Sequence, residues 1–201
     1  MTELSIAGKS VAILIANGFE EVEMTEAQRA LLRAGAAPKI ISPEQGLVNG
    51  WHGTSWGHYF PTDKQVGEVL AADFDLLVLP GGERSVTKLA SNPHTRRIVG
   101  SFMDAGKGIA AINHGVQLLA VAQRLKGRTV TGHEAVREAA EAQGATWVAE
   151  EGQNMNIDRF LLTARGPEEV VPEFIETMLR VFGEAIEHRR QAALEKAAAA
   201  A

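Results

Sequence analysis

Three short segments carry residue types that could form a catalytic or binding site. An acidic cluster at 20–23 ends in Glu23, Gly81-Gly82 makes a small-residue turn, and Asn113-His114 is a polar pair between apolar stretches. A carboxylate and an imidazole are the usual general acids and bases of enzymes. The backbone N–H groups of a Gly-Gly turn can approach an anion closely, because no side chain stands in the way.

Residues 108–120 have the pattern of a strand that turns directly into a helix. The apolar run 109–112 predicts a buried strand, and a helical spacing of apolar residues begins at Val116. The apex of such an elbow lies at the carboxyl edge of the sheet, where open α/β sheets bind ligands. Hydrolases usually place their nucleophile there. Here the apex is Asn113, an amide that cannot attack a substrate but tolerates the positive φ expected at this position.

Strands that alternate with helices bring these segments to one edge of a sheet. Continuous apolar runs predict strands buried on both faces, and apolar residues at helical spacing follow them. We therefore expect an α/β fold, a flavodoxin-like doubly wound and mostly parallel sheet with helices on both faces. The expected strands are 10–16, 39–42, 74–79, 109–112, 146–149 and 160–164, with a short exposed strand at 126–131, a polar turn at 150–158, and helices beginning near 23, 86, 93, 116, 133 and 167.

Residues 43–62 are expected to be irregular and are rich in Gly, Trp and His. One interpretation is a hairpin loop whose Trp rings cover the edge of the sheet. The other is a rim over the site, with Trp56 on the rim and His52 or His58 facing a ligand. The sequence leaves both open.

Glu83 and His133 complete the expected rim of the pocket. No pair among the histidines at 52, 58, 114 and 133 has the spacing of a zinc motif, so we expect no metal site. No other cofactor is indicated by any motif.

Length and composition indicate one globular domain. The chain has 201 residues, of which 45% are hydrophobic and 22% charged, with a net charge of −5. We expect a single domain at 1–187 and an Ala-rich tail at 188–201. Scattered basic residues argue against a nucleic-acid partner, and the absence of long apolar runs argues against a membrane, so a cytoplasmic location is expected. The sequence contains no cysteine, which excludes disulfides and thiol catalysis.

Several sequence blocks, in order, resemble the ThiJ/PfpI family of the class I glutamine-amidotransferase-like superfamily. That family includes PfpI-type intracellular proteases, protein deglycases and bacterial stress proteins. The resemblance runs from about residue 9 to residue 184. Its blocks are VAIL at 11–14, GFEEVE at 18–23, FDLLVLPGG at 74–82, AAI-x-HG-x-QLL at 110–119, LKGR at 125–128 and LTAR-x-P at 162–167.

The resemblance assigns a role to each polar segment. Glu23 matches the buried glutamate that normally hydrogen-bonds the nucleophilic cysteine, and His114 matches the histidine that follows that cysteine. Asn113 stands where the family has the nucleophile. Its amide can donate a hydrogen bond to Glu23, which would satisfy the buried carboxyl group. The expected oxyanion and binding positions are Gly81, Gly82 and Gly115.

Two further positions depart from the family pattern. PfpI-type proteases have an acid, lent by a neighbouring subunit to the histidine, four residues after the Gly-Gly turn, where this chain has Val86. The usual proline after His-Gly is Val116. Without the acid, Glu83 is the remaining candidate to orient His114.

Three hypotheses on function follow. The first is a stress-type family member that is inactive in covalent thiol chemistry and binds a small molecule or a partner in the pocket. The second is a thiol-independent enzyme in which Glu23 or His114 acts as general acid or base on small carbonyl compounds. The third is a cysteine-less engineered variant of an ordinary family hydrolase or deglycase. The resemblance also implies a homodimer, with a hexamer as the alternative.

Overall fold

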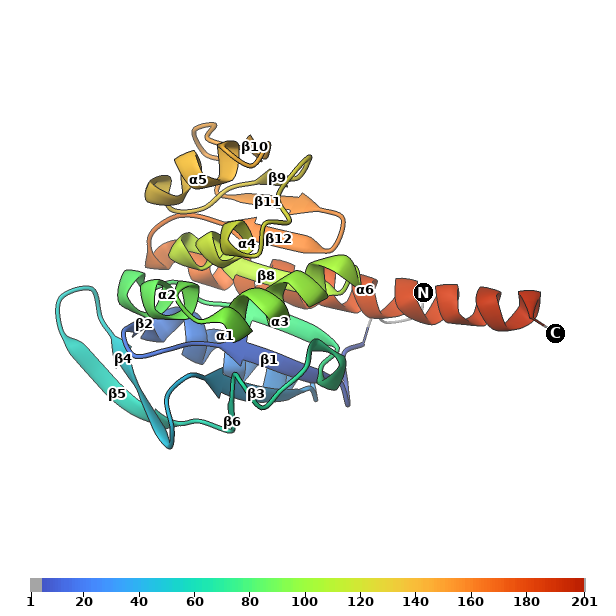
Figure 1. Cartoon of the computed structure of the whole chain (residues 1–201), viewed down its shortest axis with the longest axis horizontal. Helices are drawn as coiled ribbons and strands as arrows, with labels where there is room; N and C mark the ends of the chain where they lie inside the picture. The colour runs from blue at the N-terminus through green and yellow to red at the C-terminus, as the bar shows by residue number, and fades with distance from the viewer. Residues whose placement is uncertain (1–4, 201) are drawn as a thin grey trace.

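The computed structural model describes residues 5–200 and shows a central sheet covered by helices on both faces (Figure 1). The sheet has seven strands in the order β11-β12-β8-β7-β1-β3-β6, and every pair of neighbours is parallel except β11 with β12. This confirms the flavodoxin-like doubly wound fold. The strands are β1 (Ser10–Leu14), β3 (Ala37–Ser42), β6 (Lys64–Gln65), β7 (Leu76–Leu79), β8 (Gly108–Ile112), β11 (Met155–Asp158) and β12 (Leu161–Ala164).

Two hydrophobic cores lie on opposite faces of this sheet. In β8, Ile109 and Ala111 belong to one core, and Ala110 and Ile112 belong to the other. Both faces are therefore buried, which explains why the central strands are apolar without alternation. The first core packs under α2 (Glu83–Ala90), α3 (Pro93–Asp104), α4 (Gln117–Val121) and α5 (Arg137–Glu141), and the second under α1 (Glu21–Arg33) and α6 (Val171–Ala199).

The Asn92 side chain caps the first turn of α3. It accepts a hydrogen bond from the backbone N–H of His94 at 2.9 Å, and Pro93 occupies the first helical turn. The cap satisfies one backbone donor of the first turn, and proline loses nothing there because its position needs no N–H.

Residues 47–61 form an antiparallel hairpin, as one of the two interpretations predicted, so the expectation that 43–62 are irregular was wrong for most of this segment. β4 (Leu47–Trp51) pairs antiparallel with β5 (Trp56–Pro61), and β2 (Phe19–Glu20) adds a parallel strand on the other side of β4. In β4 the buried residues Val48 and Gly50 alternate with more exposed ones. A buried glycine contributes no apolar signal, which is why the alternation is hard to read from the sequence.

Other boundaries also differ from the predicted ones. The polar turn expected at 150–158 contains β11, an antiparallel edge strand whose Ile157 is 40% exposed. The strand expected at 126–131 is only β9 (Thr129–Val130), which pairs with β10 (Thr146–Trp147). The helix expected from 133 begins as a 3-10 turn, and α2 begins three residues before the predicted 86. The 3-10 turns are η1 (Ala71–Asp73), η2 (Asn113–Val116), η3 (Glu134–Val136) and η4 (Glu168–Val170).

Helix α6 continues unbroken through the Ala-rich residues and extends beyond the sheet (Figure 1). Its side chains from His188 onward are exposed, so high helix propensity and local pairs such as Arg190 with Glu187 at 3.0 Å support this part. No helix in residues 5–200 combines the length and the apolar character needed to cross a bilayer.

The elbow after β8 tests the packing directly. A Cβ on Gly115 would lie inside 3.0 Å of the Leu79 and Pro80 carbonyl oxygens, which are backbone atoms that cannot swing away. We expect Gly115→Ala to lower the free energy of unfolding by about 1–3 kcal/mol in urea denaturation.

Gly100 in α3 is the matched control, because a Cβ there meets its nearest atom, the Ala122 carbonyl oxygen, at 4.0 Å. Gly100→Ala should be neutral or stabilising by up to about 1 kcal/mol. Equal stability of the two variants would contradict the close packing of the elbow.

Candidate functional site

The elbow between β8 and η2 places Asn113 at the floor of a pocket. Its φ is 51°, as expected for a strained apex that Asn tolerates. The close approach of the buried Gly115 to the end of β7 fixes the direction in which the chain leaves the sheet. The Asn113 side chain therefore points to where the strand ends converge.

The amide of Asn113 is hydrogen-bonded on both sides. Its Nδ2 donates to Glu23 Oε1 at 2.7 Å and to the Gly166 carbonyl at 3.0 Å, and its Oδ1 accepts from the Gly166 N–H at 3.0 Å. Both amide hydrogens are thus used, and the group joins α1 to the loop between β12 and η4. The expected bond to Glu23 is confirmed.

Glu23 is buried, and both its oxygens accept hydrogen bonds. Oε2 accepts from the Gly81 N–H at 2.5 Å, and Oε1 accepts from Asn113. Burial raises the pKa of Glu23 to about 7, although the hydrogen bonds from Asn113 and Gly81 oppose that shift and the nearby Glu20 adds to it. Near neutral pH this carboxyl group is shared between its charged and neutral forms.

The two glycines of the Gly81-Gly82 turn have different roles, although both were expected to face a ligand. The Gly81 N–H is occupied by Glu23, so Gly81 serves the protein interior rather than a ligand. Gly82 has a φ of 103°, and a Cβ there would lie inside 3.0 Å of the Gly18 oxygen and the Phe19 Cα. Only glycine fits this contact with the first strand's loop, and Gly82 is the remaining candidate for an oxyanion donor in the turn.

His114 stacks on His133, with ring centroids 3.9 Å apart and planes at 22°. Burial lowers the pKa of His114, the neighbouring His133 lowers it further, and Glu83 partly opposes them. His114 is therefore neutral at pH 7. Glu83 acts on His114 through its charge alone, since no hydrogen bond joins the two side chains in the described part of the chain. Val86 is fully buried in the core, so the position expected for a subunit-lent acid faces inward.

Glu83 lines a neighbouring cavity, whereas Glu23, Asn113, His114 and His133 line a cavity of about 400 Å³ at the carboxyl edge of the sheet. Its wall is acidic. Burial raises the pKa of Glu20, His52 opposes this shift, and the nearby Glu168 adds to it. The polar lining residues are Glu20, Glu23, His52, Asn113, His114, His133 and Glu168.

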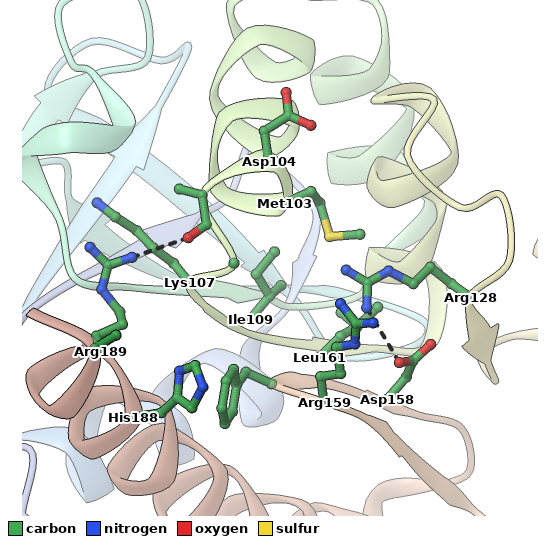
Figure 2. A pocket seen from close by; sticks show the side chains of 14 residues that line it. Met103, Asp104, Lys107, Ile109, Arg128, Asp158, Arg159, Leu161, His188 and Arg189 are labelled. Atoms are coloured by element: carbon green, nitrogen blue, oxygen red, sulfur yellow. Dashed lines mark hydrogen bonds and ion pairs between the residues drawn. The ribbon is translucent and has the colours of Figure 1, made fainter. Parts of the chain in front are cut away.

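A larger cavity of about 770 Å³ lies at the opposite edge of the sheet, beside α6 (Figure 2). Two of its cationic groups, Lys107 and Arg128, are engaged within the protein. Lys107 donates to the Ala71 and Phe74 carbonyls, and Arg128 pairs with Asp158 at 3.3 Å. Because the elbow after β8 and the Gly81-Gly82 turn after β7 lie at the carboxyl edge of the sheet, we assign the functional site to the smaller cavity.

The family profile of DJ-1/PfpI matches residues 9–181. The chain belongs to the DJ-1/PfpI family. Two relatives show the extent of the likeness. General stress protein 18 of Bacillus subtilis is 34% identical over 164 residues, covering 81% of this chain and 92% of that protein. Deglycase PfpI of Pyrococcus furiosus is 35% identical over 141 residues, covering 70% of this chain and 82% of that one.

A solved structure supports the same assignment. A two-domain protein of Anabaena variabilis, with DJ-1/ThiJ/PfpI-like and ferritin-like domains, is 30% identical and superposes with a TM-score of 0.78 over 87% of this chain. The chain spans 48% of that protein, about half its length.

The hairpin contributes to the DJ-1/PfpI pocket through His52, which lines the cavity. Trp56 and His58 do not line it. Trp56 packs edge-on against Trp51 at 5.2 Å between centroids, and His58 turns to the side chain of Glu21. Trp51 borders a neighbouring cavity of about 680 Å³. The guanidinium carbon of Arg84 lies 3.9 Å from the centroid of the Trp51 ring.

Sequence reasoning missed the loop that follows β12. Gly166, Pro167 and Glu168 line the cavity, and Gly166 holds Asn113. The signal was available, because β12 is parallel to β8 and its carboxyl end must meet the elbow.

The raised pKa of Glu23 predicts a specific pH dependence of stability. The folded protein holds this proton up to about pH 7, whereas the unfolded chain releases it near the ordinary glutamate pKa of 4.5. The stabilisation is fully present below pH 4.5 and is lost as the pH rises to about 7. In urea unfolding, the stability of the unchanged protein relative to Glu23→Gln should therefore fall by on the order of 3 kcal/mol as the pH rises over this range.

Glu26→Gln, on the more exposed side of the same helix, should keep the pH profile of the unchanged protein. Parallel profiles for the unchanged protein and Glu23→Gln would show that Glu23 does not titrate in this range.

Proposed function

We propose that this DJ-1/PfpI protein binds a small polar molecule non-covalently and does not perform covalent thiol chemistry. One observation carries the proposal. Asn113, which stands at the nucleophile position, forms its side-chain hydrogen bonds with Glu23 and Gly166. It therefore holds the pocket together and presents no reactive group to a ligand.

The rest of the chain supplies no replacement thiol, because the sequence contains no cysteine. A thiolate is the nucleophile that an acyl or hemithioacetal intermediate would need. The scaffold around the position is retained in Glu23, Gly82 and His114. A pocket that keeps its scaffold but has no nucleophile favours binding of a ligand over its conversion.

The charge of the cavity indicates the class of ligand. Glu20 and Glu168 line it together with the neutral His114, so the pocket disfavours anions. A volume of about 400 Å³ suits a small metabolite. We therefore infer a neutral or cationic polar ligand.

A second candidate function rests on the pKa of Glu23, which lies near 7 and suits a general acid or base. In this scheme Glu23 or His114 would move a proton on a small carbonyl compound, and the Gly82 N–H would hold the developing oxyanion. Both oxygens of the buried Glu23 already accept hydrogen bonds from the protein, so a substrate would have to compete with these bonds for the carboxyl group. That cost ranks this candidate second.

We also propose a homodimer, with a hexamer as the alternative, on the basis of the family resemblance. The buried Val86 gives no support to an acid shared between subunits. Mass determination in solution tests the oligomeric state.

Activity measurements separate the two functions. We expect no turnover of methylglyoxal, a glycated peptide or a generic peptidase substrate by the unchanged protein, because its pocket offers no nucleophile. Asn113→Cys places a thiol beside Glu23 and should gain turnover of at least one of them, while Asn113→Ser should stay inactive. Turnover by the unchanged protein that disappears in Glu23→Gln would overturn the proposal in favour of the acid/base enzyme.

Ligand-observed NMR with a charge-balanced set of small polar fragments tests the binding role. Neutral and cationic fragments should bind, and the double variant Glu20→Gln, Glu168→Gln should begin to accept anionic ones. Hits dominated by carboxylates and phosphates in the unchanged protein would contradict an acidic ligand site.

A further inference from the structure

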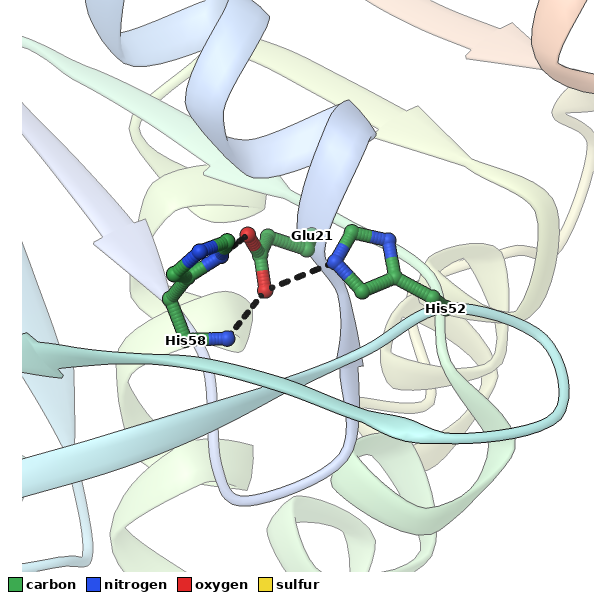
Figure 3. A group of neighbouring side chains, drawn as sticks. All are labelled: Glu21, His52 and His58. Atoms are coloured by element: carbon green, nitrogen blue, oxygen red, sulfur yellow. Dashed lines mark hydrogen bonds and ion pairs between the residues drawn. The ribbon is translucent and has the colours of Figure 1, made fainter.

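Three side chains gather where the β4–β5 hairpin crosses the start of α1 (Figure 3). Glu21 extends from the helix, and His52 and His58 extend from the hairpin. His58 Nδ1 lies 2.6 Å from Glu21 Oε1, and His52 Nε2 lies 3.3 Å from Glu21 Oε2. The three ligating atoms all lie within 4.8 Å of one another. No role in the pocket described above accounts for this cluster.

We propose that Glu21, His52 and His58 form a binding site for a divalent transition-metal ion of the Zn²⁺ type. Two imidazoles and one carboxylate are a common ligand set for such ions, with the remaining coordination positions open to water. Nitrogen ligands disfavour Ca²⁺ and Mg²⁺, which prefer oxygen.

The distances fit this assignment after a small movement. A tetrahedral Zn²⁺ with bonds of about 2.0–2.1 Å separates neighbouring ligand atoms by about 3.3 Å. The 3.3 Å from His52 Nε2 to Glu21 Oε2 already has this value, whereas the 2.6 Å from His58 Nδ1 to the other oxygen, Oε1, must widen. The His58 side chain is 80% exposed and has room to move, whereas the Glu21 side chain is 8% exposed and stays fixed.

The hairpin is shaped around the Glu21 carboxylate. A Cβ on Gly50 or on Gly57 would come inside 3.0 Å of Glu21 Oε2, so both strands need glycine where the carboxylate enters. The His58 backbone N–H donates to Oε2 at 2.7 Å and orients the group. Such support from outside the ligand atoms is typical of metal sites.

Glu21 is also charged at neutral pH, as a metal ligand must be. Burial pushes its pKa up, but the hydrogen bonds from His58 and the nearby His52 outweigh burial, so the pKa of Glu21 lies below its ordinary value. An imidazole–carboxylate pair without metal would use the same contacts, and the experiment must separate the two.

Occupation of the site would act on the pocket through His52. Its ring lines the cavity beside Glu20, and a metal bond would hold the hairpin tip against α1. This inference does not depend on the proposed function, since the cluster stands whether the cavity binds or converts its ligand.

Isothermal titration of the chelator-treated full chain with Zn²⁺, together with metal analysis after gel filtration, tests the site. We expect one Zn²⁺ per chain at micromolar or tighter affinity. His58→Ala and His52→Ala should each weaken binding at least about 10-fold, because even outer-shell partners of a metal site contribute that much. His94→Ala, which removes a histidine of α3 outside the cluster, should bind as the unchanged chain does.

Glu21→Gln is the control for misfolding, because the glutamine side-chain oxygen can still accept a hydrogen bond from the His58 N–H while the negative charge is lost. This variant should keep its circular dichroism and melting temperature in chelator and still lose Zn²⁺ affinity. Co²⁺ should give the absorption bands of a nitrogen- and oxygen-ligated ion that vanish in His58→Ala. Absence of Zn²⁺ binding, or binding unchanged in His52→Ala and His58→Ala, would overturn the proposal.

Discussion

The hydrogen bond from Asn113 Nδ2 to Glu23 Oε1 is the interaction on which the site depends. A carboxyl group as buried as Glu23 is costly unless its oxygens have partners, and Asn113 and the Gly81 N–H supply them. The same amide binds Gly166 on its other side. One side chain thereby joins α1, the turn after β7, the elbow after β8 and the loop after β12.

This arrangement explains how a DJ-1/PfpI fold persists without its thiol. The elbow requires a residue that tolerates positive φ, and the pocket requires a donor for Glu23. Asn meets both requirements, so shape and polarity survive while nucleophilicity is lost. What remains is a pocket lined by the carboxyl groups of Glu20, Glu23 and Glu168 and by three imidazoles, without a nucleophile.

The central strands and the elbow could be predicted because local pattern determines them. Strands buried on both faces are apolar without a break, and a strand meeting a helix within a few residues leaves one geometry for Asn113. The convergence of Glu23, Gly82 and Asn113 follows from parallel strands sharing a carboxyl edge. Their placement needed no knowledge of long-range contacts.

Elements determined by tertiary contacts could not be predicted. The hairpin mixes Gly, Trp and His, and its shape depends on Glu21 entering between Gly50 and Gly57. His58 meets Glu21 across 37 residues, a distance that no short metal motif describes. Gly81 was expected to face a ligand, but its N–H is used by Glu23, which only the packed structure reveals.

The side-chain amide of Asn113 offers the most direct measurement of the central claim, that this residue holds Glu23 rather than serving a ligand. In ¹⁵N-labelled protein, its two amide protons can be assigned by their loss in Asn113→Ser. We predict that they exchange slowly and shift with a midpoint at pH about 7, the pKa of Glu23, and that the shift disappears in Glu23→Gln. Rapid exchange and no titration near pH 7 would show an amide that does not hold Glu23, and would contradict this account.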